Sequence, residues 1–196
     1  MMGAEALPDF RLRPDGEVAS GFAALGLKDF RAAACHVRDL PYGRNSDRSD
    51  YGLVLDEARG TCSTKHALLA ALAREHGAPV GLRLGVYLMD GRNTTGVGPV
   101  LRRHGLDALP EAHCYLAYRE TRVDVTRAQA RIPGPFLREE TIAPGQIGAY
   151  KVEAHRAFLR AWATERGLDP DLVWLAREEC IAALSGIDAR TRTASQ

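Results

Sequence analysis

The stretch GTCSTKHALLAALAREHG, residues 60–77, predicts the centre of the fold. Its leucines share one face of a helix over 62–76, and alanines fill much of the remaining surface. Thr61 or Ser63 can cap the start of this helix, and Gly77 stands where helices often end in a left-handed residue. A helix this rich in alanine and leucine is expected to pack against neighbours on several sides.

Cys62 opens this predicted helix directly after a loop. Unpaired N–H groups and the helix dipole favour negative charge there, so a thiol is biased toward the nucleophilic thiolate. The same N–H groups can stabilise the oxyanion that forms when a thiolate attacks a carbonyl. Cys62 is therefore the candidate nucleophile, and a small buried apolar residue is the structural alternative. Lys65, one turn later, is expected to be solvated.

Flanking segments predict the remaining elements. A helix is expected over 25–37 and a strand over 80–89, whose even-numbered residues face inward. Residues 113–118 and 121–126 predict a hairpin with a tight connection near Arg119 to Thr121. Strands that follow one another after a helix indicate an α+β class with an antiparallel sheet.

The other segments are expected to be helical or irregular. Residues 1–20 read as extended, and 131–150 as a loop. Residues 90–111 read as a long irregular stretch, and its glycine-rich part over 91–98 as a flexible loop that borders the site. Two helices, over 151–166 and 170–185, close the chain.

A thiolate nucleophile needs a general base, usually a histidine that a third group orients. His113 begins the first predicted hairpin strand, and Asp124 lies on the second. A two-residue turn pairs odd positions with even ones, so Asp124 falls opposite Tyr115 or Ala117, on the face that carries His113. Asp124 is then expected to orient the imidazole, whereas a three-residue loop would place the two side chains on opposite faces.

Three short motifs together resemble the transglutaminase-like superfamily. They are Gly60-Thr61-Cys62 opening a helix that ends in His76-Gly77, Ala112-His113 starting a strand, and Val123-Asp124-Val125-Thr126 on the next strand. The order Cys, His, Asp matches that family, and the resemblance covers about residues 25–126. It implies a papain-like fold, with the cysteine helix packed on an antiparallel sheet, and thiol-based acyl chemistry. Members include peptidases, amidases, protein cross-linkers and inactive relatives.

The resemblance also implies an oxyanion-hole side chain upstream of the nucleophile. The candidates for this role are Tyr42, Asn45 and Tyr51. His66 lies four residues after Cys62 on the same helix face, so it is the alternative base.

Composition limits the classes of function. The chain has 196 residues, of which 45% are hydrophobic and 26% charged, and a formal net charge of +1. These values are ordinary for a globular protein, and such a charge gives no reason to expect nucleic-acid or acidic-membrane binding. We expect a single domain over 1–196. It has a core over about 21–150, a helical extension over about 151–185, and a frayed tail over 186–196.

No apolar stretch approaches the about 20 residues that span a membrane. Residues 1–16 lack the pattern of a secretory signal, so we expect a cytoplasmic protein with reduced thiols. The cysteine spacings match no zinc template, and we expect neither a metal nor a cofactor. The alternative zinc set would be Cys62, His113, Cys114 and Asp124, but Cys114 faces away from His113 on its strand.

The leading prediction is a thiol-dependent hydrolase or acyl transferase. It would act on an amide, peptide or ester bond of a peptide, a protein or a small amide. One alternative is a non-catalytic relative that binds a peptide or partner protein. Another is a thiol-dependent redox or sulfur-transfer protein, for which no resolving cysteine is evident. The reactivity of Cys62 toward an alkylating reagent separates the first two classes.

Overall fold

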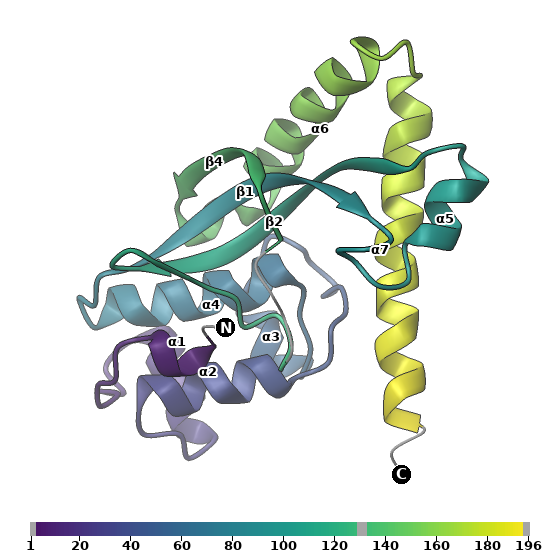
Figure 1. The fold of residues 1–196 in the computed structure, drawn as a ribbon. Coiled ribbons are helices and arrows are strands. Elements are labelled where there is room, and N and C mark those ends of the chain that lie inside the picture. Colours follow the sequence, from purple (N-terminus) through teal and green to yellow (C-terminus); the bar gives the residue numbers. More distant parts are fainter. Residues whose placement is uncertain (1–2, 129–132, 194–196) are drawn as a thin grey trace. The chain divides into compact units, whose positions relative to one another are not determined.

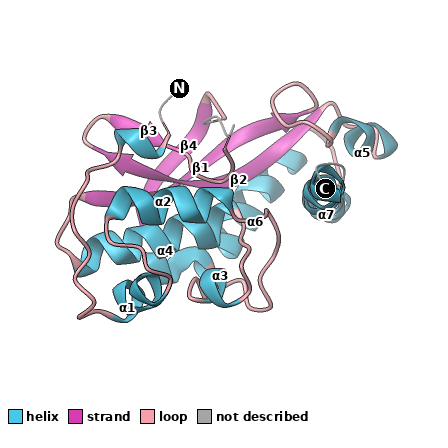
Figure 2. Cartoon of the chain, turned by 90° about the horizontal axis from the view of Figure 1, so that it is seen from below, coloured by secondary structure: helices cyan, strands magenta, loops and turns pink. Residues whose placement is uncertain are grey.

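The computed structural model describes residues 3–128 and 133–193 (Figure 1). This part of the chain combines helices with one antiparallel sheet in the order β3-β2-β1-β4, which confirms the α+β class (Figure 2). The strands are β1 (Val80–Asp90), β2 (Ala108–Tyr118), β3 (Thr121–Val123) and β4 (Phe136–Ile142). Within the described ranges, no helix is both long enough and apolar enough to cross a bilayer.

The chain divides into two compact units, each made of three segments. The first unit comprises Met1–Leu84, Cys114–Ile132 and Glu140–Gly148. The second unit comprises Gly85–His113, Pro133–Glu139 and Ala149–Gln196. One boundary coincides with the predicted start of a helical extension near residue 151. The others fall in or beside β1, β2 and β4, so these three strands each belong partly to both units.

Helix α4 is the centre of the first unit. The helices around it are η1 (Ala4–Ala6), α1 (Glu17–Ala24), α2 (Phe30–Asp39), α3 (Leu53–Asp56) and η2 (Pro144–Ile147). Helices α1, α2, α3 and η2 contact α4 (Cys62–Glu75), and every residue of α4 up to Ala73 is buried. The expectation that this helix packs on several sides is confirmed.

Both ends of α4 follow the predicted capping pattern. Thr61 is the N-cap, and its N–H donates to the Thr64 hydroxyl at 3.0 Å. At the other end, Gly77 adopts a φ of 64° and its N–H reaches the carbonyl of Arg74 at 3.1 Å. The left-handed conformation favours glycine, because a Cβ would crowd the backbone.

Helix α1 corrects the expectation of an extended chain over 1–20. Its N-terminus is capped from a distant segment, because the Glu75 carboxylate accepts the N–H groups of Val18 and Ala19, each at 2.9 Å. A carboxylate is favourable there since it satisfies unpaired donors and complements the helix dipole. A local pattern cannot reveal this cap, because Glu75 is far away in the sequence.

Strand β1 confirms the prediction over 80–89, but its simple alternation ends midway. Leu88, expected inside, is 38% exposed, whereas Tyr87 is buried. In the second unit, the Phe136 ring lies within 2.6 Å of where a Cβ on Gly85 would stand. The Tyr87 ring meets the same ring edge-on, with 6.4 Å between centroids. Glycine at 85 therefore makes room for Phe136, which holds Tyr87 inside.

Three elements, of which η2 is one, were expected to be irregular chain. Helix α5 (Gly98–Arg103) lies inside the predicted loop over 90–111, and β4 lies inside the one over 131–150. Strand β4 is at the edge of the sheet and most of its side chains are exposed or half-buried. An exposed edge strand lacks the alternation of apolar residues by which strands are predicted. Residues 131 and 132 lie outside the described residues.

Helices α6 (Ala149–Thr164) and α7 (Pro170–Thr193) confirm the two predicted C-terminal helices, and they contact each other. Asp169 caps α7 as predicted, since its carboxylate accepts the N–H of Asp171 at 2.9 Å. The tail was expected to fray over 186–196, but the backbone remains helical through Thr193. The last three residues lie outside the described part of the chain.

A buried ion pair joins β2 to α7 within the second unit. The Arg177 guanidinium donates to both carboxylate oxygens of Glu111, at 2.7 Å each. Burial opposes ionisation of Glu111, but the charge and hydrogen bonds of Arg177, together with the charges of His155 and Lys151, outweigh it and lower the pKa of this carboxyl to about 2. Burial also lowers the pKa of His155, whose Nε2 donates to the Pro110 carbonyl at 2.9 Å.

The first prediction concerns this pair. Arg177→Met leaves Glu111 buried without its counter-charge and is expected to lower the free energy of unfolding by about 3–5 kcal/mol at pH 7. Urea denaturation followed by tryptophan fluorescence measures this, because both tryptophans of the chain belong to the second unit. Arg103→Met is the control, since Arg103 pairs with Glu179 at the surface and is expected to cost less than about 1 kcal/mol. Equal effects of the two variants would contradict a special role for the buried pair.

The pair also predicts acid sensitivity. The pKa of Glu111 is about 2 in the folded state, below its ordinary value of 4.5. Its contribution to stability is therefore complete above pH 4.5 and is lost as the pH falls toward 2. Glu111→Gln should flatten the pH dependence of the unfolding free energy in this window. A variant with the wild-type slope would refute this origin of the acid sensitivity.

Candidate active site

Cys62 lies where the sequence predicts, as the first residue of α4. Its side chain is largely buried, with 8% of the residue exposed, and Sγ lies 3.9 Å from the hydroxyl of Ser63. This position places the thiol at the positive end of the helix dipole, which favours the thiolate. The activation of this thiol and its nucleophilic role stay predictions.

His66 connects the start of α4 to the segment that follows β3. Its Nδ1 lies 2.7 Å from the carbonyl oxygen of Cys62, and its Nε2 lies 2.9 Å from the N–H of Val125. Nε2 accepts that N–H, so Nδ1 carries the ring proton and donates it to the carbonyl. The ring is fully buried. Because both ring nitrogens serve backbone groups, this geometry disfavours His66 as the alternative base.

Asp124 lies beside His66 in the same unit. Its Oδ1 is 3.5 Å from Nε2 of His66 and accepts the N–H of Thr126 at 2.8 Å. The Nε2 atom already accepts the N–H of Val125, so it has no proton to donate to this carboxylate. The residue is only 5% exposed. The structure thus brings Asp124 and the carbonyl of Cys62 to opposite sides of one imidazole ring.

Lys65 corrects the expectation of a solvated side chain, because it is fully buried. Its Nζ donates to the carbonyl oxygens of Leu40 at 2.6 Å, Thr126 at 2.8 Å and Arg38 at 3.3 Å. An ammonium has three N–H donors, so these three carbonyls match its capacity. Sequence reasoning missed this residue since the acceptors lie on segments distant in the chain.

The hairpin has the register that the predicted triad requires. Strands β2 and β3 pair antiparallel, with Tyr118 opposite Thr121 and Leu116 opposite Val123. The connection is therefore a two-residue turn, and odd positions face even ones. Strand β3 ends at Val123, which is shorter than the strand predicted over 121–126, so Asp124 lies one residue beyond the last paired position.

His113 is the last residue of a segment of the second unit, whereas Cys62 and Asp124 belong to the first. His113 is half-buried, and its ring meets that of Tyr87 edge-on with 6.4 Å between centroids. The pairing of His113 with Cys62 and Asp124 stays a prediction.

Asn45, one of the three oxyanion-hole candidates, holds the loop that precedes α4. Its Nδ2 donates to the carbonyls of Arg59 at 3.0 Å and Leu53 at 3.2 Å. Its Oδ1 accepts the hydroxyl of Thr64 at 2.8 Å. Since the amide hydrogens already serve the loop, this geometry favours the two tyrosine candidates over Asn45.

Tyr42, the second candidate, lies beside the chain that leads into α4. Its backbone forms a parallel bridge with Gly60, two residues before Cys62, and its ring lies 4.6 Å from the guanidinium of Arg127. Tyr51 instead lines a pocket between α1 and α3. The role of either tyrosine as a donor to an oxyanion stays a prediction.

The remaining cysteines have other surroundings. Cys114 and Cys180 are buried, and Cys35 is half-buried on α2. Burial, with a contribution from the charge of Glu111, raises the pKa of Cys180 to about 11, so this thiol is expected to be unreactive. Within the described ranges, no group of three His, Cys, Asp or Glu side chains is arranged to hold a metal ion.

No family model matches the chain, and no curated protein or solved structure matches it either. The resemblance to the transglutaminase-like superfamily therefore rests on the three sequence motifs alone.

The contacts of His66 generate a prediction about stability. His66→Ala leaves the N–H of Val125 and the carbonyl of Cys62 without their side-chain partner in a buried site. The expected loss is about 2–5 kcal/mol of unfolding free energy, measured by urea denaturation with far-UV circular dichroism. His36→Ala, at a half-buried position on α2, is the control and is expected to cost less than about 1 kcal/mol. Similar losses in the two variants would mean that the ring of His66 does not hold the two segments together.

Proposed function

We propose that the protein is a thiol-dependent hydrolase or acyl transferase that acts on an amide, peptide or ester bond. The Cys62 thiolate attacks the carbonyl carbon, a C–S bond forms, and the C–N or C–O bond breaks. His113 takes the thiol proton and returns it to the leaving amine or alcohol. Water, or another acceptor, then cleaves the thioester and gives its proton to His113, which regenerates the thiolate.

One observation carries this proposal. His66 bonds the carbonyl of Cys62 on one side and the N–H of Val125 on the other, which fixes the start of the nucleophile helix beside Asp124. Cys62 and Asp124, two of the three residues that the resemblance implies for the site, therefore lie in one buried region whose backbone is held by hydrogen bonds to His66. A nucleophile held this firmly meets the requirement that reacting groups be preorganised.

The other residues take supporting roles in the proposal. Asp124 orients His113 so that its free nitrogen faces the thiol, and the hairpin register is the one this role needs. The N–H groups at the start of α4 and the hydroxyl of Tyr42 stabilise the oxyanion. A reactive thiolate needs a reducing compartment, and all four cysteines are free thiols, so we expect a cytoplasmic location.

The low exposure of Cys62 favours a second candidate. A thiol in a residue that is 8% exposed can serve as a packing residue of a non-catalytic domain that binds a peptide or partner protein. The two candidates differ in what they predict for the reactivity of this thiol.

The decisive experiment is the pH dependence of iodoacetamide labelling, followed residue by residue by mass spectrometry. In the hydrolase, the labelling midpoint of Cys62 lies well below the about 8.5 of an ordinary thiol, and His113→Ala raises it by at least about one pH unit. His36→Ala is the matched control and should leave the midpoint unchanged. Cys114 and Cys180 report on unfolding, since they should stay unlabelled in the folded protein.

Treatment with 4-nitrophenyl acetate extends the test to acyl transfer. An acetyl group should appear on Cys62, and His113→Ala should slow its formation by about 10²–10⁴-fold. Ordinary or absent labelling of Cys62, with no acyl-enzyme, would refute the hydrolase and support the binding domain.

A further inference from the structure

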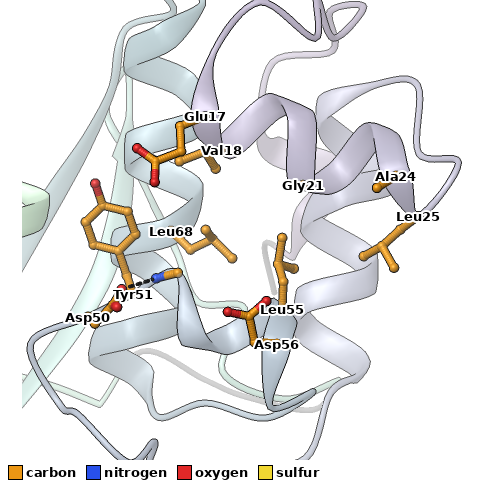
Figure 3. A pocket seen from close by; sticks show the side chains of 11 residues that line it. Glu17, Val18, Gly21, Ala24, Leu25, Asp50, Tyr51, Leu55, Asp56 and Leu68 are labelled. Atoms are coloured by element: carbon orange, nitrogen blue, oxygen red, sulfur yellow. Dashed lines mark hydrogen bonds between the residues drawn. The ribbon is translucent and has the colours of Figure 1, made fainter.

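A pocket of about 450 Å³ lies in the first unit, between α1, α3 and the turn that precedes α3 (Figure 3). Its volume is within the about 300–1,000 Å³ that is usual for small-ligand sites. Leu55 and Leu68 point into it, and Leu25 at its edge is 50% exposed. The pocket therefore offers an aliphatic surface to a ligand.

Three carboxylates surround this aliphatic surface, those of Glu17, Asp50 and Asp56 (Figure 3). No lysine, arginine or histidine lines the pocket. Among the described residues, none of the three carboxylates has an ion-pair partner, although Asp50 accepts the N–H of Gly52 at 2.8 Å. Carboxylates without counter-ions around one hollow favour a ligand of positive charge.

The cation is expected to be organic. In the part of the chain that the structure describes, no three acidic, histidine or cysteine side chains gather closely enough to bind a metal ion. The three carboxylates instead stand on different sides of Leu55 and Leu68 (Figure 3). That spacing fits a ligand whose aliphatic part fills the hollow while its charge reaches the rim.

We infer that this pocket binds a lysine or arginine side chain of a polypeptide. Such side chains join an aliphatic stem to a terminal cation, which matches an aliphatic floor with an acidic rim. The ring of Tyr51 adds an aromatic face for the cation. This site goes beyond the proposed hydrolase reaction and does not depend on it.

The test is a titration of the ¹⁵N-labelled full chain with Nα-acetyl-lysine amide. Binding should shift the amide resonances of Gly21 and Gly52, which line the pocket. Nα-acetyl-norleucine amide is the matched control, because it has the same carbon chain without the ammonium, and it should bind about tenfold more weakly. Raising the salt concentration to about 0.5 M should weaken the lysine compound only.

Two double variants assign the effect to the rim. Glu17→Gln with Asp56→Asn should weaken binding of the lysine compound by about tenfold. Asp9→Asn with Glu120→Gln removes the same charge from exposed positions of the same unit and should have little effect. The inference is overturned if no resonance shifts, if norleucine binds equally well, or if the control variant weakens binding as much. None of these outcomes depends on the chemistry of Cys62.

Discussion

The ammonium group of Lys65 is out of contact with solvent, and three backbone carbonyls take the place of water around it. Burial of an unpaired ammonium is costly by several kcal/mol, so the fold is stable only where these acceptors converge. Two of them are at the end of α2 and one is at Thr126, just after the hairpin. The hydrogen bond from the Lys65 ammonium to the Thr126 carbonyl therefore helps to fix where the end of the hairpin packs against α4.

The other contacts at the start of α4 agree with this constraint. Gly60 has no space for a side chain, because a Cβ there would lie 2.9 Å from both Cγ of Lys65 and Oγ1 of Thr64. Thr64 is held in turn by Asn45, and His66 fixes the backbone on either side of its ring. The side chains of Lys65 and His66 thus bond backbone groups, and Cys62 begins the helix at the positive end of its dipole.

The sequence was most informative where structure depends on neighbours in the chain. Periodicity and caps predicted α4 and β1, and with α4 the place of Cys62, whereas Asp124 lies just beyond the end of the strand on which it was expected. It failed where the decisive partner is remote: Glu75 caps α1, and three distant carbonyls bury Lys65. The sequence did contain one signal for the burial of Lys65. A lysine followed by a histidine in an otherwise apolar helix places two polar side chains among buried neighbours.

The interleaving of the two units has an evolutionary consequence. Six segments alternate between them, so the chain changes unit five times, and three strands contribute to both. No single crossover between genes can exchange one unit alone, because every contiguous fragment that contains one whole unit also contains part of the other. Variation in this protein is therefore expected to accumulate through point substitutions and changes of loop length. Domain shuffling, which spreads functions among proteins with separable domains, is not expected for this protein.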